Sequence, residues 1–206
     1  TGDDALISLA GPANKQGRII ADNICGGDSR YLGSQASSVI KVFDMTAATT
    51  GINETNAKKS GLEVDTVILS PMSHAGYYPG GKVMTMKVVF EKETYRLLGA
   101  QIIGYEGVDK RIDVLATAIH AGLKAIQLKD LDLAYAPPYS SAKDPVNMAG
   151  FMIDNIAKGT LKQWHLEDMD KISKGKDVVL LDVRTVGEFN SCLLYTSPSP
   201  RDRSLS

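Results

Sequence analysis

The sequence has little cysteine, no excess of charge of either sign and no long apolar run. Its 206 residues include 2 cysteines, Cys25 and Cys192, which are too few and too far apart for a disulfide framework. The formal net charge of −1 gives no electrostatic reason to expect nucleic acid or an anionic membrane as a partner. No apolar stretch has the length of a membrane span, and the N-terminus lacks a signal-peptide layout. We therefore expect a cytoplasmic protein.

Motifs for nucleotides and metals are also missing. The sequence contains no GxGxxG fingerprint and no phosphate-binding loop. Its three histidines are not spaced with Asp or Cys as metal ligands, so no metal site is predicted. Cys25 follows a predicted helix, where the helix dipole disfavours a thiolate. We interpret Cys25 as a buried structural thiol rather than a nucleophile.

Apolar periodicity predicts an α+β domain. The 82–91 run, which contains VMTMKVVF, alternates poorly, as expected of a strand that is covered on both faces. Lys110 and Arg111 are interpreted as a solvated face of the helix over 108–121. The expected architecture is an antiparallel sheet with helices on one face. The other predicted elements are helices over 11–24, 46–60 (broken at Gly51) and 145–157, and strands over 39–43, 64–69 and 95–104.

The segment 133–150, LAYAPPYSSAKDPVNMAG, carries the strongest local signals in the chain. Pro137 and Pro138 restrict the backbone and present Tyr139 on a stiff turn. Asp144 stands where a helix N-cap belongs, and Pro145 takes the first helical position. This pattern is typical of a turn that places a tyrosine against a partner.

The same segment resembles the C-terminal dimerisation domain of the FAD-dependent pyridine nucleotide-disulfide oxidoreductases, in the branch that holds CoA-disulfide reductases and related NADH oxidases. Residues 5–24, ALISLAGPANKQGRIIADNI, resemble the strand end and helix that close the flavin site in that branch. The stretch SSVIKVFDMTAATTG, which ends at Gly51, resembles the first strand and helix of the dimerisation domain. The three matches occur in order and span residues 5–158.

The resemblance implies a domain organisation and a cofactor site. Residues 1–35 would be the end of an FAD-binding domain, and residues 36–159 a dimerisation domain through which the protein forms a homodimer. The helix that begins after Leu9 would point at the flavin, where its free N–H groups and positive dipole end favour a negative partner. The residues expected to contact FAD are Leu9, Ala10, Gly11, Pro12 and Ala13.

The resemblance also implies catalytic tyrosines. In CoA-disulfide reductases, two tyrosines of the dimerisation domain reach the redox cysteine of the other subunit. By motif, Tyr139 is one candidate, and either Tyr77 or Tyr78 is the other. A phenol with a pKa of about 10 is a suitable proton donor for a departing thiolate with a pKa of about 8.5. The alternative interpretation is that these tyrosines only pack at an interface.

The C-terminal part shows two further patterns. In residues 160–191, LLDVRT-x-x-EF resembles the opening of an α/β rhodanese domain, which here would be truncated. Residues 192–206 resemble the conceptual translation of a sequencing-library adapter, and a natural disordered tail is the alternative. The chain thus looks cut at both ends.

The functional expectation is a fragment of a FAD-dependent NAD(P)H:disulfide oxidoreductase, most like a CoA-disulfide reductase fused to a rhodanese. The substrate would be CoA-disulfide or a related low-molecular-weight sulfur compound. The fragment alone would be inactive and would supply dimerisation and active-site residues in trans. Alternatives are an NADH oxidase, a persulfide or polysulfide reductase, or a non-catalytic dimerisation module. The flavin-facing helix argues against the last.

Overall fold

The computed structural model describes residues 6–169 and 185–191. The chain divides into two compact units, 1–161 and 162–206. The first unit holds helix α1 (Ala10–Ile24) and a sheet domain, and the described part of the second holds the 3-10 helix η2 (Leu166–Asp168) and helix α6 (Val186–Ser191). Most of the LLDVRT pattern and the adapter-like tail lie outside the described residues. Within those residues, no helix is both long and apolar enough to cross a membrane.

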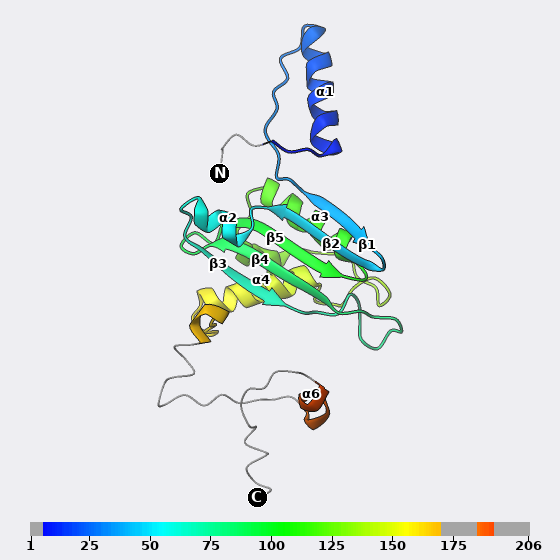
Figure 1. Cartoon of the computed structure of the whole chain (residues 1–206), viewed down its shortest axis with the longest axis vertical. Helices are drawn as coiled ribbons and strands as arrows, with labels where there is room; N and C mark the ends of the chain where they lie inside the picture. Colours follow the sequence, from blue (N-terminus) through cyan, green and yellow to red (C-terminus); the bar gives the residue numbers. More distant parts are fainter. Residues whose placement is uncertain (1–5, 170–184, 192–206) are drawn as a thin grey trace, which may run out of the picture. The chain divides into compact units, whose positions relative to one another are not determined.

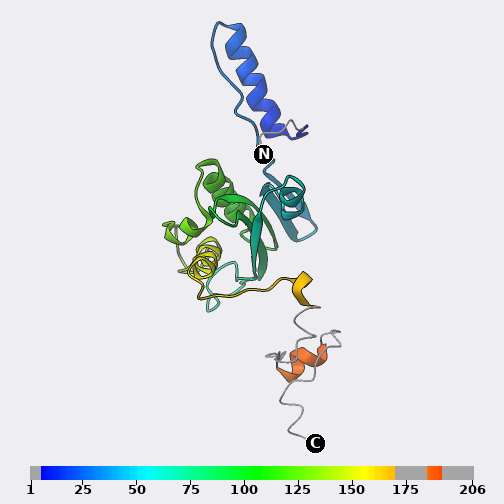
Figure 2. The same cartoon turned by 90° about the vertical axis from the view of Figure 1, so that its left-hand side faces the viewer.

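A five-stranded sheet forms the centre of the first unit, in the order β1-β2-β5-β4-β3, with every neighbouring pair antiparallel. Helices α3 (Val108–His120) and α4 (Pro145–Ala157) and the 3-10 helix η1 (Ala125–Asp130) cover one face of it (Figures 1 and 2). This arrangement confirms the predicted α+β architecture. The strands are β1 (Ser38–Val42), β2 (Met45–Gly51), β3 (Val64–Leu69), β4 (Met84–Glu91) and β5 (Leu97–Gly104).

The main core lies between the sheet and the helices on its covered face. Val88 of β4, Leu115 of α3 and Ile153 of α4 are fully buried in it. On the opposite face the short helix α2 (Glu54–Lys59) packs Ala57 against Val89 in a second, smaller cluster. Strand β4 is therefore buried on both faces over Val88, Val89 and Phe90, as its poor alternation predicts, whereas Thr85 on the first half of the strand is exposed.

Strand β2 corrects one prediction, because a helix was expected over 46–60. The chain instead turns at Phe43 and Asp44, and β2 pairs with β1 on one side and with β5 on the other. Threonine favours strands, and both edges of β2 find hydrogen-bonding neighbours, so the sheet overrides the helical tendency of the alanines. Only α2, after Gly51, is helical in this stretch.

Helix α4 begins and ends at the predicted residues. Asp144 is its N-cap, and the side chain accepts a hydrogen bond from the backbone N–H of Val146 at 3.0 Å. In return, the Asn147 side chain accepts one from the Asp144 N–H at 3.1 Å. Pro145 occupies the first turn, where its missing N–H costs nothing. These local contacts fix where the preceding turn ends.

Candidate functional site

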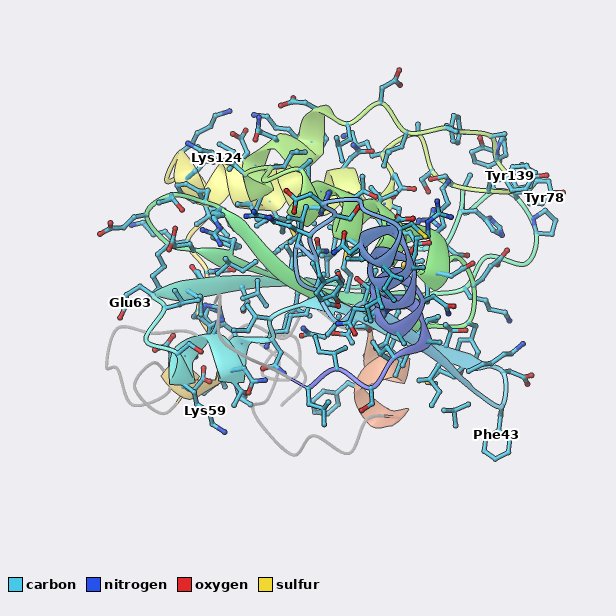
Figure 3. The ribbon with its side chains drawn as sticks, turned by 90° about the horizontal axis from the view of Figure 1, so that it is seen from above. Phe43, Lys59, Glu63, Tyr78, Lys124 and Tyr139 are labelled. Carbon is cyan, nitrogen blue, oxygen red and sulfur yellow. The ribbon has the colours of Figure 1, made fainter. Side chains whose placement is uncertain are left out.

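Two segments that are far apart in sequence meet at one end of the sheet domain. They are the loop between β3 and β4, which contains Tyr77 and Tyr78, and the turn before α4, which contains Tyr139. The backbone N–H of Ala75 donates to the carbonyl of Ser140 at 3.0 Å and joins them directly. Figure 3 places Tyr78 and Tyr139 together at this end. The fold thus assembles the predicted tyrosine segments into one region.

Arg111 lies beneath this region and corrects a second prediction. Its side chain was expected on a solvated helix face, but Arg111 is only 1% exposed. Its Nη2 donates to the carbonyl of Ser73 at 2.9 Å and to the Ser140 hydroxyl at 3.2 Å. It also contacts the carbonyl of Tyr139 at 3.3 Å. A buried arginine needs such partners, and they come from segments that the helical pattern around Arg111 does not reveal.

Asp144 is the counterion of Arg111. The Nη2–Oδ2 distance is 2.9 Å, and the Ser140 hydroxyl donates to the same carboxylate at 2.6 Å. Burial alone would raise the pKa of Asp144, but the hydrogen bonds from Ser140, Arg111 and the Val146 N–H together hold it below its ordinary value. The ionised carboxylate of Asp144 therefore caps α4 and also balances the positive charge of Arg111. We call Arg111, Ser140 and Asp144 the arginine cluster.

One of the candidate tyrosines, Tyr77, is paired with a tyrosine that was not among the candidates. The hydroxyl oxygens of Tyr77 and Tyr135 lie 2.7 Å apart, at hydrogen-bonding distance. The hydrogen bond with Tyr77, followed by partial desolvation, raises the pKa of Tyr135. Tyr135 was missed, although it lies in the same LAYAPPYSS segment as Tyr139. No local signal distinguishes it, because its partner is 58 residues away.

The other two candidate tyrosines have different surroundings. The Tyr78 ring meets His74 edge-on, with 5.6 Å between the ring centroids and 79° between the planes. His74 itself is buried and directs Nδ1 toward the carbonyl of Ala75 at 3.1 Å. Tyr139 is 71% exposed, and its main chain, rather than its ring, contacts the arginine cluster. The structure therefore brings all four tyrosines to one end, but only Tyr77 and Tyr135 join through their hydroxyls.

A cavity of about 520 Å³ opens beside the tyrosines. The charged residues that line it are Glu106, Lys110 and Arg111. The Ser73 hydroxyl donates to the Glu106 carboxylate at 3.3 Å. The rings of Tyr135 and Tyr139 line the same space. A ligand in this cavity would meet tyrosine side chains together with one acidic and two basic residues. Among the described residues, no group of three or more His, Cys, Asp or Glu side chains could hold a metal ion.

Helix α1 carries the residues expected at the flavin. It begins at Ala10 after the N-cap Leu9, and its first turn contains no acidic side chain. Its first backbone N–H groups therefore remain available to a negatively polarised group, except at Pro12, which has none. None of its residues is buried within the chain, and Ile24 is 81% exposed. This exposure fits a helix that needs a further surface to pack against.

Cys25 requires a third correction. It caps the C-terminus of α1 as expected, but it is exposed rather than buried. The prediction rested on the lack of features that activate a thiol, which do not determine burial, and no residue of α1 is buried or belongs to the main core.

The antiparallel sheet with helices on one face is the architecture of a dimerisation domain of the disulfide oxidoreductases. Residues 37–145 match the model of the pyridine nucleotide-disulphide oxidoreductase dimerisation domain. The chain belongs to this family.

Among its relatives, the Coenzyme A disulfide reductase of Staphylococcus epidermidis is 37% identical over 148 residues, which are 71% of this chain and 33% of that protein. The solved structure of reduced Bacillus anthracis CoADR-RHD is 44% identical, with a TM-score of 0.89, and the match covers 99% of this chain and 38% of the other. The solved structure of a NAD-dependent persulfide reductase from A. fulgidus is 42% identical, with a TM-score of 0.83, and the match covers 91% of this chain and 34% of the other. The chain thus spans about a third of the length of its relatives.

Proposed function

We propose that this chain is part of a FAD-dependent NAD(P)H:disulfide oxidoreductase, most like a CoA-disulfide reductase, and that it supplies the dimer surface and proton-donating tyrosines. The observation that carries the proposal is the hydroxyl pair of Tyr77 and Tyr135, of which Tyr135 lines the cavity. The 37% identity to a Coenzyme A disulfide reductase supports the choice of a disulfide substrate.

The net reaction would convert one disulfide, NAD(P)H and a proton into two thiols and NAD(P)⁺. Each departing sulfur leaves as a thiolate and needs a proton. One hydroxyl of the Tyr77–Tyr135 pair would give its proton to this thiolate, and the other would donate a hydrogen bond to the phenolate oxygen that remains. The geometry supports this exchange, because the two hydroxyl oxygens lie 2.7 Å apart.

The proposed roles of Tyr78 and Tyr139 follow from their positions. Tyr78, held against His74, would form part of the wall that a substrate meets. Tyr139 remains a candidate donor, since its ring lines the cavity. The shared hydrogen bond nevertheless favours Tyr77 and Tyr135, because a neighbouring hydroxyl stabilises the phenolate that proton transfer leaves behind.

FAD would bind at the start of α1, through Leu9, Ala10, Gly11, Pro12 and Ala13. The free N–H groups and the absence of acidic side chains in this turn fit a group that gains negative charge. When bound, FAD would pass electrons from NAD(P)H to the disulfide centre. The nicotinamide site and the redox cysteine would lie in the part of the protein that precedes residue 1.

The domain of residues 36–159 would form the homodimer. The hairpin of β1 and β2 exposes Val39, Ile40 and Phe43, and Phe43 at its tip is 94% exposed. Apolar side chains gathered on one hairpin support a surface that a second chain covers. The cavity at the tyrosines would then face the flavin domain of the partner subunit.

Residues 160–191 would begin a rhodanese domain. The match to B. anthracis CoADR-RHD supports this, because it covers 99% of the chain and so continues past residue 159. A rhodanese, which handles sulfane sulfur, would also suit the second candidate function, persulfide reduction. The 42% identity to a persulfide reductase favours that alternative over oxygen as the substrate.

Steady-state turnover of CoA-disulfide by the full-length parent protein tests the proposal. Tyr77→Phe and Tyr135→Phe should each lower kcat by about 10²-fold, because general-acid catalysis contributes an effect of that order. Tyr95→Phe is the matched control, because Tyr95 stacks on Phe90 in the core, and it should leave kcat unchanged. Unchanged turnover in both cavity variants would refute the proton-donor role. A persulfide turned over faster than CoA-disulfide would select the second candidate.

A further inference from the structure

The backbone that carries each hydroxyl of the Tyr77–Tyr135 pair is held by the same buried side chain. Ser73, whose carbonyl accepts from Arg111 at 2.9 Å, lies four residues before Tyr77 in the β3–β4 loop. Ser140, whose hydroxyl accepts from Arg111 at 3.2 Å, lies five residues after Tyr135 in the turn before α4. One guanidinium thus bridges the two segments whose spacing sets the distance between the hydroxyls.

The bridge is built from groups that cannot easily move. Arg111 is 1% exposed and Asp144 is 3% exposed, so neither is solvated enough to leave its partner. Arg111 Nη1 also donates to the carbonyl of Gly107 at 3.2 Å, which fixes the guanidinium against the start of its own helix. A planar guanidinium with several fixed N–H donors holds partners in different directions at once.

We infer that Arg111 is a positioning residue that sets the geometry of the Tyr77–Tyr135 pair. The inference rests on the proposed function for its catalytic meaning. Arg111 does not reach the substrate in this account and acts only through the two tyrosine segments. Arg111 borders the cavity together with Glu106 and Lys110, but it is only 1% exposed, and its guanidinium donates to Ser73, Ser140 and Asp144.

The Arg111→Lys substitution distinguishes a positioning role of Arg111 from a role as the counterion of Asp144. An ammonium group would keep a positive charge beside Asp144, and its three rotatable donors would satisfy the carboxylate. It would not reproduce the fixed fork that joins Ser73, Ser140 and Asp144 together. If Arg111 served only as a counterion, Arg111→Lys would restore everything that Arg111→Met removes. If Arg111 positions the tyrosines, Arg111→Lys keeps the fold but separates the hydroxyl pair.

The first test uses NMR on the 206-residue chain with labelled tyrosine and phenylalanine rings. In the wild type, the rings of Tyr77 and Tyr135 should show a mutual nuclear Overhauser effect, because their hydroxyl oxygens are 2.7 Å apart. This signal should disappear in Arg111→Lys, while the signal between Phe90 and Tyr95, stacked at 5.9 Å, persists and reports an intact core. Persistence of both signals in Arg111→Lys would overturn the inference.

Ser140→Ala provides a second variant if Arg111→Lys does not fold. It removes one acceptor of Arg111 and one donor to Asp144, and should weaken the Tyr77–Tyr135 signal while the Phe90–Tyr95 signal stays. Val88→Ala is the control for general destabilisation, because it opens the core at a central strand without touching the arginine cluster. It should leave both signals in place. Loss of the Tyr77–Tyr135 signal in Val88→Ala as well would overturn the inference.

The second test uses the full-length parent protein and keeps the two proposals apart. Arg111→Lys should lower kcat for the disulfide by at least about tenfold, as expected when reacting groups are displaced by a fraction of an ångström or more. The rate at which NAD(P)H reduces the flavin should not change. If Tyr77→Phe impairs turnover but Arg111→Lys does not, the inference fails and the proposed function stands. If Tyr77→Phe and Tyr135→Phe leave turnover intact, the proposed function fails whatever the NMR result.

Discussion

The guanidinium of Arg111 and the carboxylate of Asp144 form a buried ion pair, with Nη2 2.9 Å from Oδ2, between the first turn of α3 and the cap of α4. The pair fixes the angle at which the two helices leave the tyrosine region. The Ser140 hydroxyl and the Val146 N–H also donate hydrogen bonds to the Asp144 carboxylate, so replacing Asp144 removes several interactions at once.

Asp144→Ala should destabilise the chain severely. The substitution leaves the Arg111 charge buried without its counterion and removes the helix cap, which together should cost about 3–5 kcal/mol of unfolding free energy. Urea denaturation at neutral pH measures the change. Asp22→Ala, which removes an exposed partner of Arg18 on α1, is the control and should have little effect. Equal losses in the two variants would contradict the assigned role of Asp144.

Gly107→Ala should destabilise the chain by displacing the Arg111 side chain of the arginine cluster. Gly107 has a φ of +67°, and a Cβ there would lie 2.1 Å from Nη1 of Arg111. Backbone strain and this contact together should cost about 1–3 kcal/mol. Gly76→Ala is the matched control, since a Cβ at Gly76 meets nothing within 4 Å and the φ at that position is not positive. Thermal unfolding that shifts equally in both variants would exclude the steric explanation.

Glu54→Gln should remove part of the chain's sensitivity to acid. Hydrogen bonds from Lys58 and Lys87 lower the pKa of Glu54 from 4.5 to about 2. A carboxylate whose pKa is depressed in the folded state stabilises the protein above its unfolded pKa, and this contribution is lost as the pH falls toward the folded value. After allowance for solvent screening, the wild type should be more stable than the variant by about 1 kcal/mol at pH 7.

The pH dependence of that difference is the decisive part of the prediction. The gap in unfolding free energy between wild type and Glu54→Gln should be constant from pH 7 to about pH 5 and should close between about pH 4.5 and 2. Urea titrations at intervals across this range measure it. A gap that widened on acidification would have the wrong sign and would reject the ion-pair account of Glu54.

How much of the fold was predictable depended on how local the signals are. The cap of α4 was read correctly because Asp144 and Pro145 act within one turn of the chain. Strand β4 was predicted correctly over its second half, because the consecutive apolar residues Val88, Val89 and Phe90 are typical of burial on both faces. Strand β2 was not, because its sequence MTAATTG suits a helix or a strand, and the pairing with β1 and β5 decides between them.

The candidate site divides in the same way. The segment of Tyr139 was found from its prolines, but Tyr135 was not, because its hydroxyl partner lies 58 residues away. Arg111 was taken for a surface residue, because its acceptors on Ser73 and Asp144 are 38 and 33 residues away. Cys25 was expected to be buried because nothing near it in sequence would activate a thiol, but that argument does not determine burial, and no residue of α1 is buried within this chain. Contacts between distant segments leave no local pattern in a single sequence.

A mixed dimer of the full-length parent protein tests the central claim most directly. One subunit would carry a serine in place of the redox cysteine of the flavin domain, and the other would carry Tyr77→Phe and Tyr135→Phe. If the tyrosines serve the partner's cysteine, one of the two active sites keeps both groups, and the dimer should retain about half of the wild-type turnover of CoA-disulfide. If turnover is no higher than in the homodimers of either variant, the tyrosines do not act in trans, and the account is wrong.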